Sequence, residues 1–141
     1  MTEEEFRRTY LESKAIEDYI EALRSRYQLV DASEIALNNA KDALKAVSES
    51  GVGQSLMVDV GGGIYVRASL ADTSRVLVGI GEGVYLEKSR EEAEKILEQK
   101  IESLRKAKET LVQEVNRAQA QYAERQSRLS SLSQRLPTAQ K

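Results

Sequence analysis

All eight glycines of this 141-residue chain lie between Gly51 and Gly83, and they divide the sequence into three parts. The segments on either side of them carry no glycine, and the only proline is Pro137. Glycine weakens a helix and proline ends one, so both flanking segments are free to form long helices. The sequence therefore predicts one helix that runs out, a short β region that turns the chain, and a second helix that runs back.

Apolar residues recur every seven positions in the first segment. One column of this pattern consists of Ile16, Leu23, Val30, Leu37 and Leu44. The second column, four positions later, contains Phe6, Ser13, Ile20, Tyr27, Glu34 and Lys41. Two columns at the a and d positions of a heptad are typical of the narrow seam of a coiled coil. We expect a helix over residues 3–50 that Gly51 brings to an end.

The last segment carries a matching pair of columns. The first consists of Leu97, Leu104, Leu111, Ala118, Arg125 and Leu132. The second consists of Ile101, Lys108, Val115, Tyr122, Leu129 and Leu136. Ser89 and Glu92 have the spacing of a capping box, which favours a helix start at residue 89. Since Pro137 cannot continue a helix, we expect a helix over 89–136 and a tail over 137–141.

If the two helices pack antiparallel, residues whose numbers add up to about 141 or 142 lie side by side. This register places Glu34 opposite Lys108, the two charges that would otherwise be isolated in the seam. They have two interpretations. The pair fixes the register, at a desolvation cost that offsets most of its attraction, or both side chains extend to water along their apolar stems.

The same register predicts a change in the seam near the chain ends. Beyond Ile20 and Tyr122, the leucines of the last segment face polar partners such as Ser13 and Thr9. Poorly covered apolar side chains at one end of a long helical hairpin indicate a binding surface. The competing explanation is a frayed helix end with incidental leucines. The candidate binding residues at this tip are Phe6, Tyr10, Leu11, Leu129, Leu132 and Leu136.

The glycine-containing middle, residues 54–87, has the pattern of two β-hairpins. Short runs rich in Val, Ile, Leu and Tyr cover 54–60, 64–70, 75–80 and 84–87, and glycine-containing connections of about three residues join the members of each pair. Isolated hairpins are only marginally stable, and their edges pair readily with other strands. We therefore expect other subunits to complete the sheet. The candidate oligomerisation residues are Val58, Val60, Ile64, Val66, Leu70, Val76, Val78, Ile80, Val84 and Leu86.

Composition argues against most other kinds of protein. The net charge of −2 comes from interspersed acidic and basic residues, so no basic stripe for nucleic acid is present. Without cysteine or histidine, thiolate and imidazole metal sites are excluded, and no metal or other cofactor is expected. The acidic N-terminus is unlike a secretory signal, and no apolar run of about 20 residues could span a bilayer. A soluble, cytoplasmic protein is expected.

The sequence also lacks the motifs and residue combinations that an enzyme active site requires. Residues 79–83 alternate glycine with other residues, but no lysine follows at the spacing of a phosphate loop, and a strand comes next where such a loop would open a helix. No nucleophile, base and oxyanion donor are brought together. We expect no catalytic residues, and a phosphate-handling enzyme remains a remote alternative.

Three stretches carry a resemblance to a known family. They are Val-Asp-Val-Gly-Gly-Gly-Ile-Tyr-Val at 58–66, Val-Leu-Val-Gly-Ile-Gly-Glu-Gly-Val-Tyr-Leu-Glu-Lys at 76–88, and Ser-Arg-Glu-Glu-Ala at 89–93. Across essentially its whole length the chain resembles the α-class subunit of prefoldin, of the archaeal type. Two hairpins, where the β class has one, are what mark the α class.

This resemblance implies an α+β fold with a single prefoldin-like domain over 1–141. In this domain a long antiparallel coiled coil carries two β-hairpins, and the strands of the hairpins join a β-barrel between subunits. It implies a hexamer of two α and four β subunits, and an ATP-independent chaperone that holds unfolded proteins at the tips of its coiled coils and passes them to a group II chaperonin. The alternative is a coiled-coil scaffold or tether that binds a defined folded partner. The family has no binding motif to transfer onto single positions, so the tip residues rest on the register alone.

Overall fold

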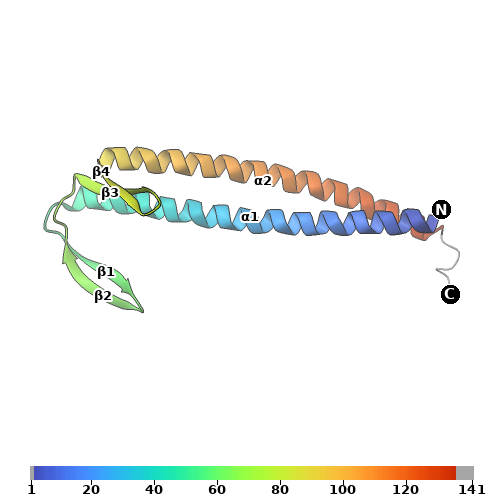
Figure 1. The fold of residues 1–141 in the computed structure, drawn as a ribbon, viewed down its shortest axis with the longest axis horizontal. Helices are drawn as coiled ribbons and strands as arrows, with labels where there is room; N and C mark the ends of the chain where they lie inside the picture. Colours follow the sequence, from blue (N-terminus) through green and yellow to red (C-terminus); the bar gives the residue numbers. More distant parts are fainter. Residues whose placement is uncertain (1, 136–141) are drawn as a thin grey trace. The chain divides into compact units, whose positions relative to one another are not determined.

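The computed structural model describes residues 2–135. Its elements are α1 (Thr2–Ser50), β1 (Ser55–Gly61), β2 (Ile64–Ser69), β3 (Arg75–Gly81), β4 (Val84–Ser89) and α2 (Arg90–Ser133), as Figure 1 shows. The described residues divide into two compact units. We call residues 2–32 and 104–135 the helix-pair unit, and residues 33–103 the strand unit. Two long helices separated by two β-hairpins confirm the expected α+β fold class.

In the helix-pair unit, the first part of α1 and the last part of α2 lie side by side and antiparallel (Figure 1). Lys108 of α2 bonds Asp31 of α1, and further along, Gln126 of α2 bonds Ser13 of α1. As the residue number rises along α2, that of its partner falls along α1, which confirms the antiparallel direction. The buried residues of this unit are Thr9, Ser13, Ile20, Leu23, Leu111, Ala118, Leu129 and Leu132.

The strand unit contains two hairpins that repeat one another. In the first, β1 pairs antiparallel with β2 and places Val58 opposite Val66. In the second, β3 pairs antiparallel with β4 and places Val78 opposite Leu86. Each pair of the second hairpin lies 20 residues after a pair of the first, so that the pair Ser55 and Ser69 recurs as Arg75 and Ser89. The two hairpins are therefore built to one plan.

The turns of both hairpins contain two residues, one fewer than the sequence predicted. In the first turn Gly62 and Gly63 have φ angles of 62° and 77°, and in the second Glu82 and Gly83 have φ angles of 52° and 76°. Positive φ at both central residues is the requirement of a type I′ turn, whose twist matches that of the flanking strands. The first glycine of each cluster, Gly61 or Gly81, still pairs across the strands and follows a bulge, which explains the shorter loop.

The start of α2 is capped by Ser89, the residue that the capping-box spacing predicted. The Ser89 hydroxyl accepts a hydrogen bond from the Glu92 N–H at 3.1 Å and donates one to the Glu92 carboxylate at 3.1 Å. The Arg90 N–H donates to the Ser74 carbonyl at 2.9 Å, and its guanidinium donates to the Thr73 carbonyl at 3.0 Å. These bonds join the first turn of α2 to the connection that precedes β3.

Within residues 2–135, β1–β2 and β3–β4 form two separate two-stranded sheets, and no third strand joins either of them. Nearly every strand residue is exposed. Two separate hairpins do not close a barrel alone, and an isolated two-stranded hairpin is only marginally stable. This agrees with a β-barrel formed between subunits.

Candidate functional site

The N-terminal part of α1 exposes two apolar side chains to solvent. Tyr10 is 53% exposed and Leu11 is 60% exposed, as their positions outside the seam predict. Phe6 is half-buried and, with Tyr10, lines a shallow groove whose other walls are Glu3, Glu4 and Arg7. The helix-pair unit thus offers aromatic and aliphatic surface at this end, with charged side chains around it.

The expectation that Leu129 and Leu132 are exposed is wrong. Leu129 is 9% exposed and Leu132 is 4% exposed, while Thr9 and Ser13 of α1 are buried as well. The physical reason lies in the size of the α1 residues. Small side chains let two helices approach closely, and the leucines are then covered by the facing helix instead of projecting to water. Leu136 lies outside the described residues.

Interhelical polar bonds also close the seam in this region. The Gln126 amide donates to the Ser13 hydroxyl at 2.7 Å, and the Arg125 guanidinium donates to the Glu12 carboxylate at 2.9 Å. Beside them, the Tyr122 hydroxyl donates to the Glu17 carboxylate at 3.2 Å. Ser13, which the heptad pattern presented as a poor partner for leucine, therefore contributes one of three polar bonds that join the helices here.

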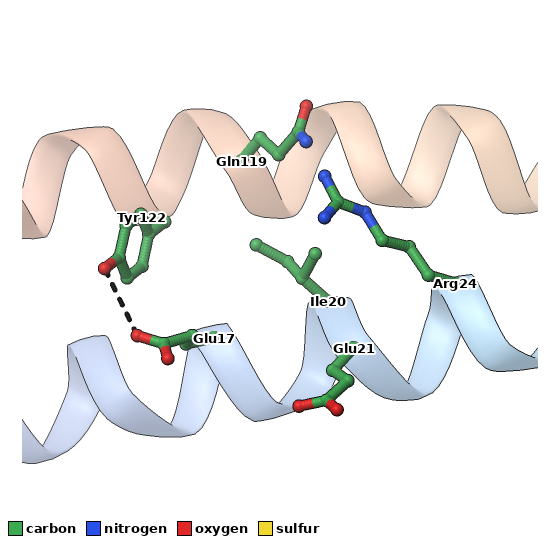
Figure 2. A pocket seen from close by; sticks show the side chains of 6 residues that line it. All are labelled: Glu17, Ile20, Glu21, Arg24, Gln119 and Tyr122. Atoms are coloured by element: carbon green, nitrogen blue, oxygen red, sulfur yellow. Dashed lines mark hydrogen bonds between the residues drawn. The ribbon is translucent and has the colours of Figure 1, made fainter.

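Two open grooves lie between α1 and α2 within the helix-pair unit, and the heptad columns alone did not indicate them. Figure 2 shows the first, where Ile20 points from α1 into the space between the helices and Arg24 extends from α1 toward Gln119 of α2. The second shares Arg24 and is lined by Tyr27, Gln28, Val112, Val115 and Asn116. Ile20 with Tyr122, and Tyr27 with Val115, are pairs that the predicted register places together, and each pair lines one groove.

Lys108 pairs with a carboxylate of α1. Its ammonium lies 2.7 Å from the Asp31 carboxylate and 5.3 Å from the centroid of the Tyr27 ring. The sequence did not single out Asp31, although its position three residues before Glu34 puts it on the same face of α1. The predicted pairing of Lys108 with Glu34 stays a prediction.

The candidate oligomerisation residues lie on the hairpins, with Leu70 just after β2. Val58 and Val66, and likewise Val78 and Leu86, face each other across the strands, so each hairpin carries an apolar face. Val76, Val78 and Leu70 are half-buried, and the remaining members are exposed. Their part in assembly stays a prediction.

The opposite face of each hairpin carries apolar side chains that the sequence analysis did not select. Met57 and Tyr65 in the first hairpin, and Leu77 and Tyr85 in the second, are exposed. The sequence did carry a signal for this second face, because the side chains of a strand alternate between its two faces and these residues fall between the candidate oligomerisation residues. Both faces of the hairpins are therefore partly apolar.

Two charged side chains outside the seam have shifted pKa values. The neighbouring carboxylates of Glu17 and Asp18 raise the pKa of Lys14. Hydrogen bonds from the Ser74 N–H and hydroxyl, each 2.8 Å long, lower the pKa of Asp72. Asp72 thereby organises the turn before β3, and neither group belongs to a cluster with acid–base chemistry.

Among the described residues, no three carboxylate side chains lie close enough together to hold a metal ion. None of the helices in that part of the chain is both long and apolar enough to cross a membrane.

Comparison with known proteins places the chain in a family. A family model described as "Prefoldin subunit" matches residues 16–135. Prefoldin subunit alpha of Thermofilum pendens is 33% identical over 107 residues, which cover 76% of this chain and 83% of that protein. Prefoldin subunit alpha of Methanopyrus kandleri is 38% identical over 80 residues, covering 57% of this chain but only 51% of the length of that relative.

A solved structure agrees with these sequence relatives. The cryo-EM structure of a filamentous PFD from Methanocaldococcus jannaschii superposes with a TM-score of 0.71 at 27% identity, and covers 79% of this chain and 93% of that chain. The family model, the α-subunit relatives and the shared helix–hairpins–helix fold point the same way. Prefoldin is a chaperone family and not an enzyme family. The chain belongs to the prefoldin family, as a chaperone subunit of the archaeal α type.

Proposed function

We propose that this subunit holds unfolded proteins at the tip of its helix-pair unit, without ATP, and passes them to a group II chaperonin. The observation that carries the proposal is the exposure of Tyr10 and Leu11 on α1, outside a seam that already buries its leucines. Since these side chains serve no packing purpose within the helix pair, they are available to apolar segments of another protein. Phe6 supports the same surface through the groove that it lines with Tyr10.

Assembly of several subunits supplies the binding affinity that one small surface lacks. We propose a hexamer of two α and four β subunits, joined through the apolar faces of the hairpins, so that several tips hold one client. Weak contacts at several tips together give high avidity and still allow release. The exposed valines and leucines of β1 to β4 support this assembly, and the filament formed by the Methanocaldococcus relative is a precedent for prefoldin chains joining into larger structures. The proposed location is the cytoplasm, and the proposed subunit has no catalytic activity.

The test compares two matched pairs of substitutions in the assembled complex with a β-type subunit. The tip variant combines Tyr10→Ser with Leu11→Ser. The control combines Tyr19→Ser with Leu29→Ser, one tyrosine and one leucine that are also exposed on α1. Suppression of the aggregation of a chemically unfolded protein should fall at least about threefold for the tip variant and stay near wild type for the control.

Native mass spectrometry provides the assembly measurement, because both variants should give the mass of the wild-type complex. If wild type and tip variant suppressed aggregation equally, the tip would not be the surface that binds unfolded proteins. Binding of one folded protein, with no effect on unfolded ones, would favour the scaffold alternative instead.

A further inference from the structure

Two basic residues occupy seam positions in α2. Lys108 and Arg125 belong to the two heptad columns, and their side chains are 20% and 27% exposed. Each reaches a carboxylate of α1: the Lys108 ammonium lies 2.7 Å from Asp31, and the Arg125 guanidinium lies 2.9 Å from Glu12. Partly buried cations in a coiled-coil seam reduce stability unless they are paired, so these positions call for an explanation.

The apolar residues of the seam do not select one register. Sliding α2 by seven residues, about 10.5 Å, keeps both heptad columns facing each other. In the predicted register Leu129 lies at the level of Ser13, and a slide toward the N-terminus of α1 would bring it to that of Phe6. A slide the other way would bring it to Ile20. Both alternatives would give Leu129 an apolar partner, so the repeat of the heptad columns does not by itself choose the observed register.

The charges do distinguish these registers. In the first slide, Lys108 would leave Asp31 and face Arg24, which places two like charges together, whereas Arg125 would exchange Glu12 for Glu5 and keep a carboxylate. Lys108 alone therefore disfavours this slide. In the second slide, Lys108 would face Asn38 and Arg125 would face Tyr19, and both ion pairs would be lost. Of the three registers, only the observed one gives both cations of the seam a carboxylate partner.

We infer that Lys108 with Asp31 and Arg125 with Glu12 form a register clamp that holds α1 and α2 in a single alignment. Polar residues in a seam are known to specify register at a cost in stability. The clamp decides which side chains the helix pair buries and which it exposes, including the buried Leu129 and Ser13. The inference concerns the alignment of the helices and does not depend on what the tip binds.

Disulfide trapping in the full-length chain tests the clamp, because the natural sequence contains no cysteine. Ser13→Cys with Gln126→Cys reports the observed register, since these side chains are hydrogen-bonded at 2.7 Å. Phe6→Cys or Ile20→Cys, each with Gln126→Cys, reports a slide of seven residues in one direction or the other. The clamp variant combines Lys108→Glu with Arg125→Glu, and the exchange variant adds Asp31→Lys and Glu12→Lys to it.

The disulfide between positions 13 and 126 should form at least about threefold less in the clamp variant, with a gain at 6 or 20, and should recover in the exchange variant. As a matched control, Lys106→Glu with Arg128→Glu reverses two exposed charges of α2 outside the seam and should leave the yield unchanged.

Two results would overturn the clamp. The first is an undiminished 13–126 yield in the clamp variant, which would mean that the connection through the strand unit sets the register. The second is an exchange variant that folds, as judged by helical circular dichroism, but does not recover that yield. Should the clamp variant itself lose its helices, the exchange variant alone decides between the two readings.

Discussion

Leucine-to-alanine substitutions at two positions of α1 test the packing of the helix pair. Leu23 is 2% exposed, whereas Leu29, six residues further along the same helix, is 71% exposed. Leu23→Ala removes apolar surface that the facing helix almost completely covers and leaves a cavity, for which we expect a loss of about 2–3 kcal/mol in the free energy of unfolding. Leu29→Ala removes surface that is mostly in water already. Its cost should be about 0.5 kcal/mol or less, because the better helix propensity of alanine offsets part of it.

Urea unfolding followed by circular dichroism at 222 nm measures the difference, at one protein concentration because assembly contributes to stability. With a urea dependence of about 1–3 kcal/mol per molar, the midpoint should fall by about 0.7–3 M for Leu23→Ala and by no more than about 0.5 M for Leu29→Ala. The two substitutions share their chemistry and their helix, so only the environment differs. Equal midpoints for the two variants would refute the assignment of Leu23 to a packed seam.

Three further predictions concern the turns and the cap. Ser89→Ala removes the hydroxyl that caps α2 and should lower the free energy of unfolding by about 1 kcal/mol in urea titrations. Ser89→Asp should retain most of the stability, because aspartate also caps helices well. An Ala variant as stable as wild type would contradict the cap. Glu82 has a positive φ, and Glu82→Asn replaces it by a residue better suited to that conformation, which should slow hydrogen exchange in β3 and β4. Faster exchange would contradict the turn assignment. For Asp72, the hydrogen bonds that lower its pKa stabilise the fold above the ordinary pKa of a carboxyl group, and this contribution is lost as the pH falls through the lowered value. Asp72→Asn should therefore lose stability relative to wild type near pH 7 and approach it near pH 2 in urea titrations, and a constant difference across that range would contradict the linkage.

The sequence patterns predicted the long elements well, because those elements are set by repeating local rules. Heptad columns on both sides of the glycine cluster indicated α1 and α2, and the Ser89–Glu92 spacing identified the cap that the structure contains. The alternation of valine and isoleucine, interrupted by glycine, indicated both hairpins. The length of each turn was missed because composition does not distinguish a glycine that ends a strand, such as Gly61, from one inside the turn.

The tip was predicted less well, and the error is instructive. The register predicted small polar partners for Leu129 and Leu132, and polarity of the partner was taken to mean poor cover, whereas both leucines are buried. Cover depends on the distance between the helices, which Thr9 and Ser13 shorten by being small. The heptad columns likewise identified Lys108 and Arg125 of α2 but not their carboxylate partners. Asp31 and Glu12 lie beside the columns of α1 and bond these cations from there.

The distance between the two ends of the chain tests the central claim most directly, namely that α1 and α2 pack antiparallel along the helix-pair unit. Spin labels on cysteines at Lys14 and Arg128, both exposed, can be measured by double electron–electron resonance in the full chain, diluted with unlabelled copies in the assembly. Packed helices place their axes about 8–10 Å apart, so with the label arms the distance should fall below about 25 Å. A single population beyond about 50 Å, the span expected if the two helices extended away from each other, would contradict the account.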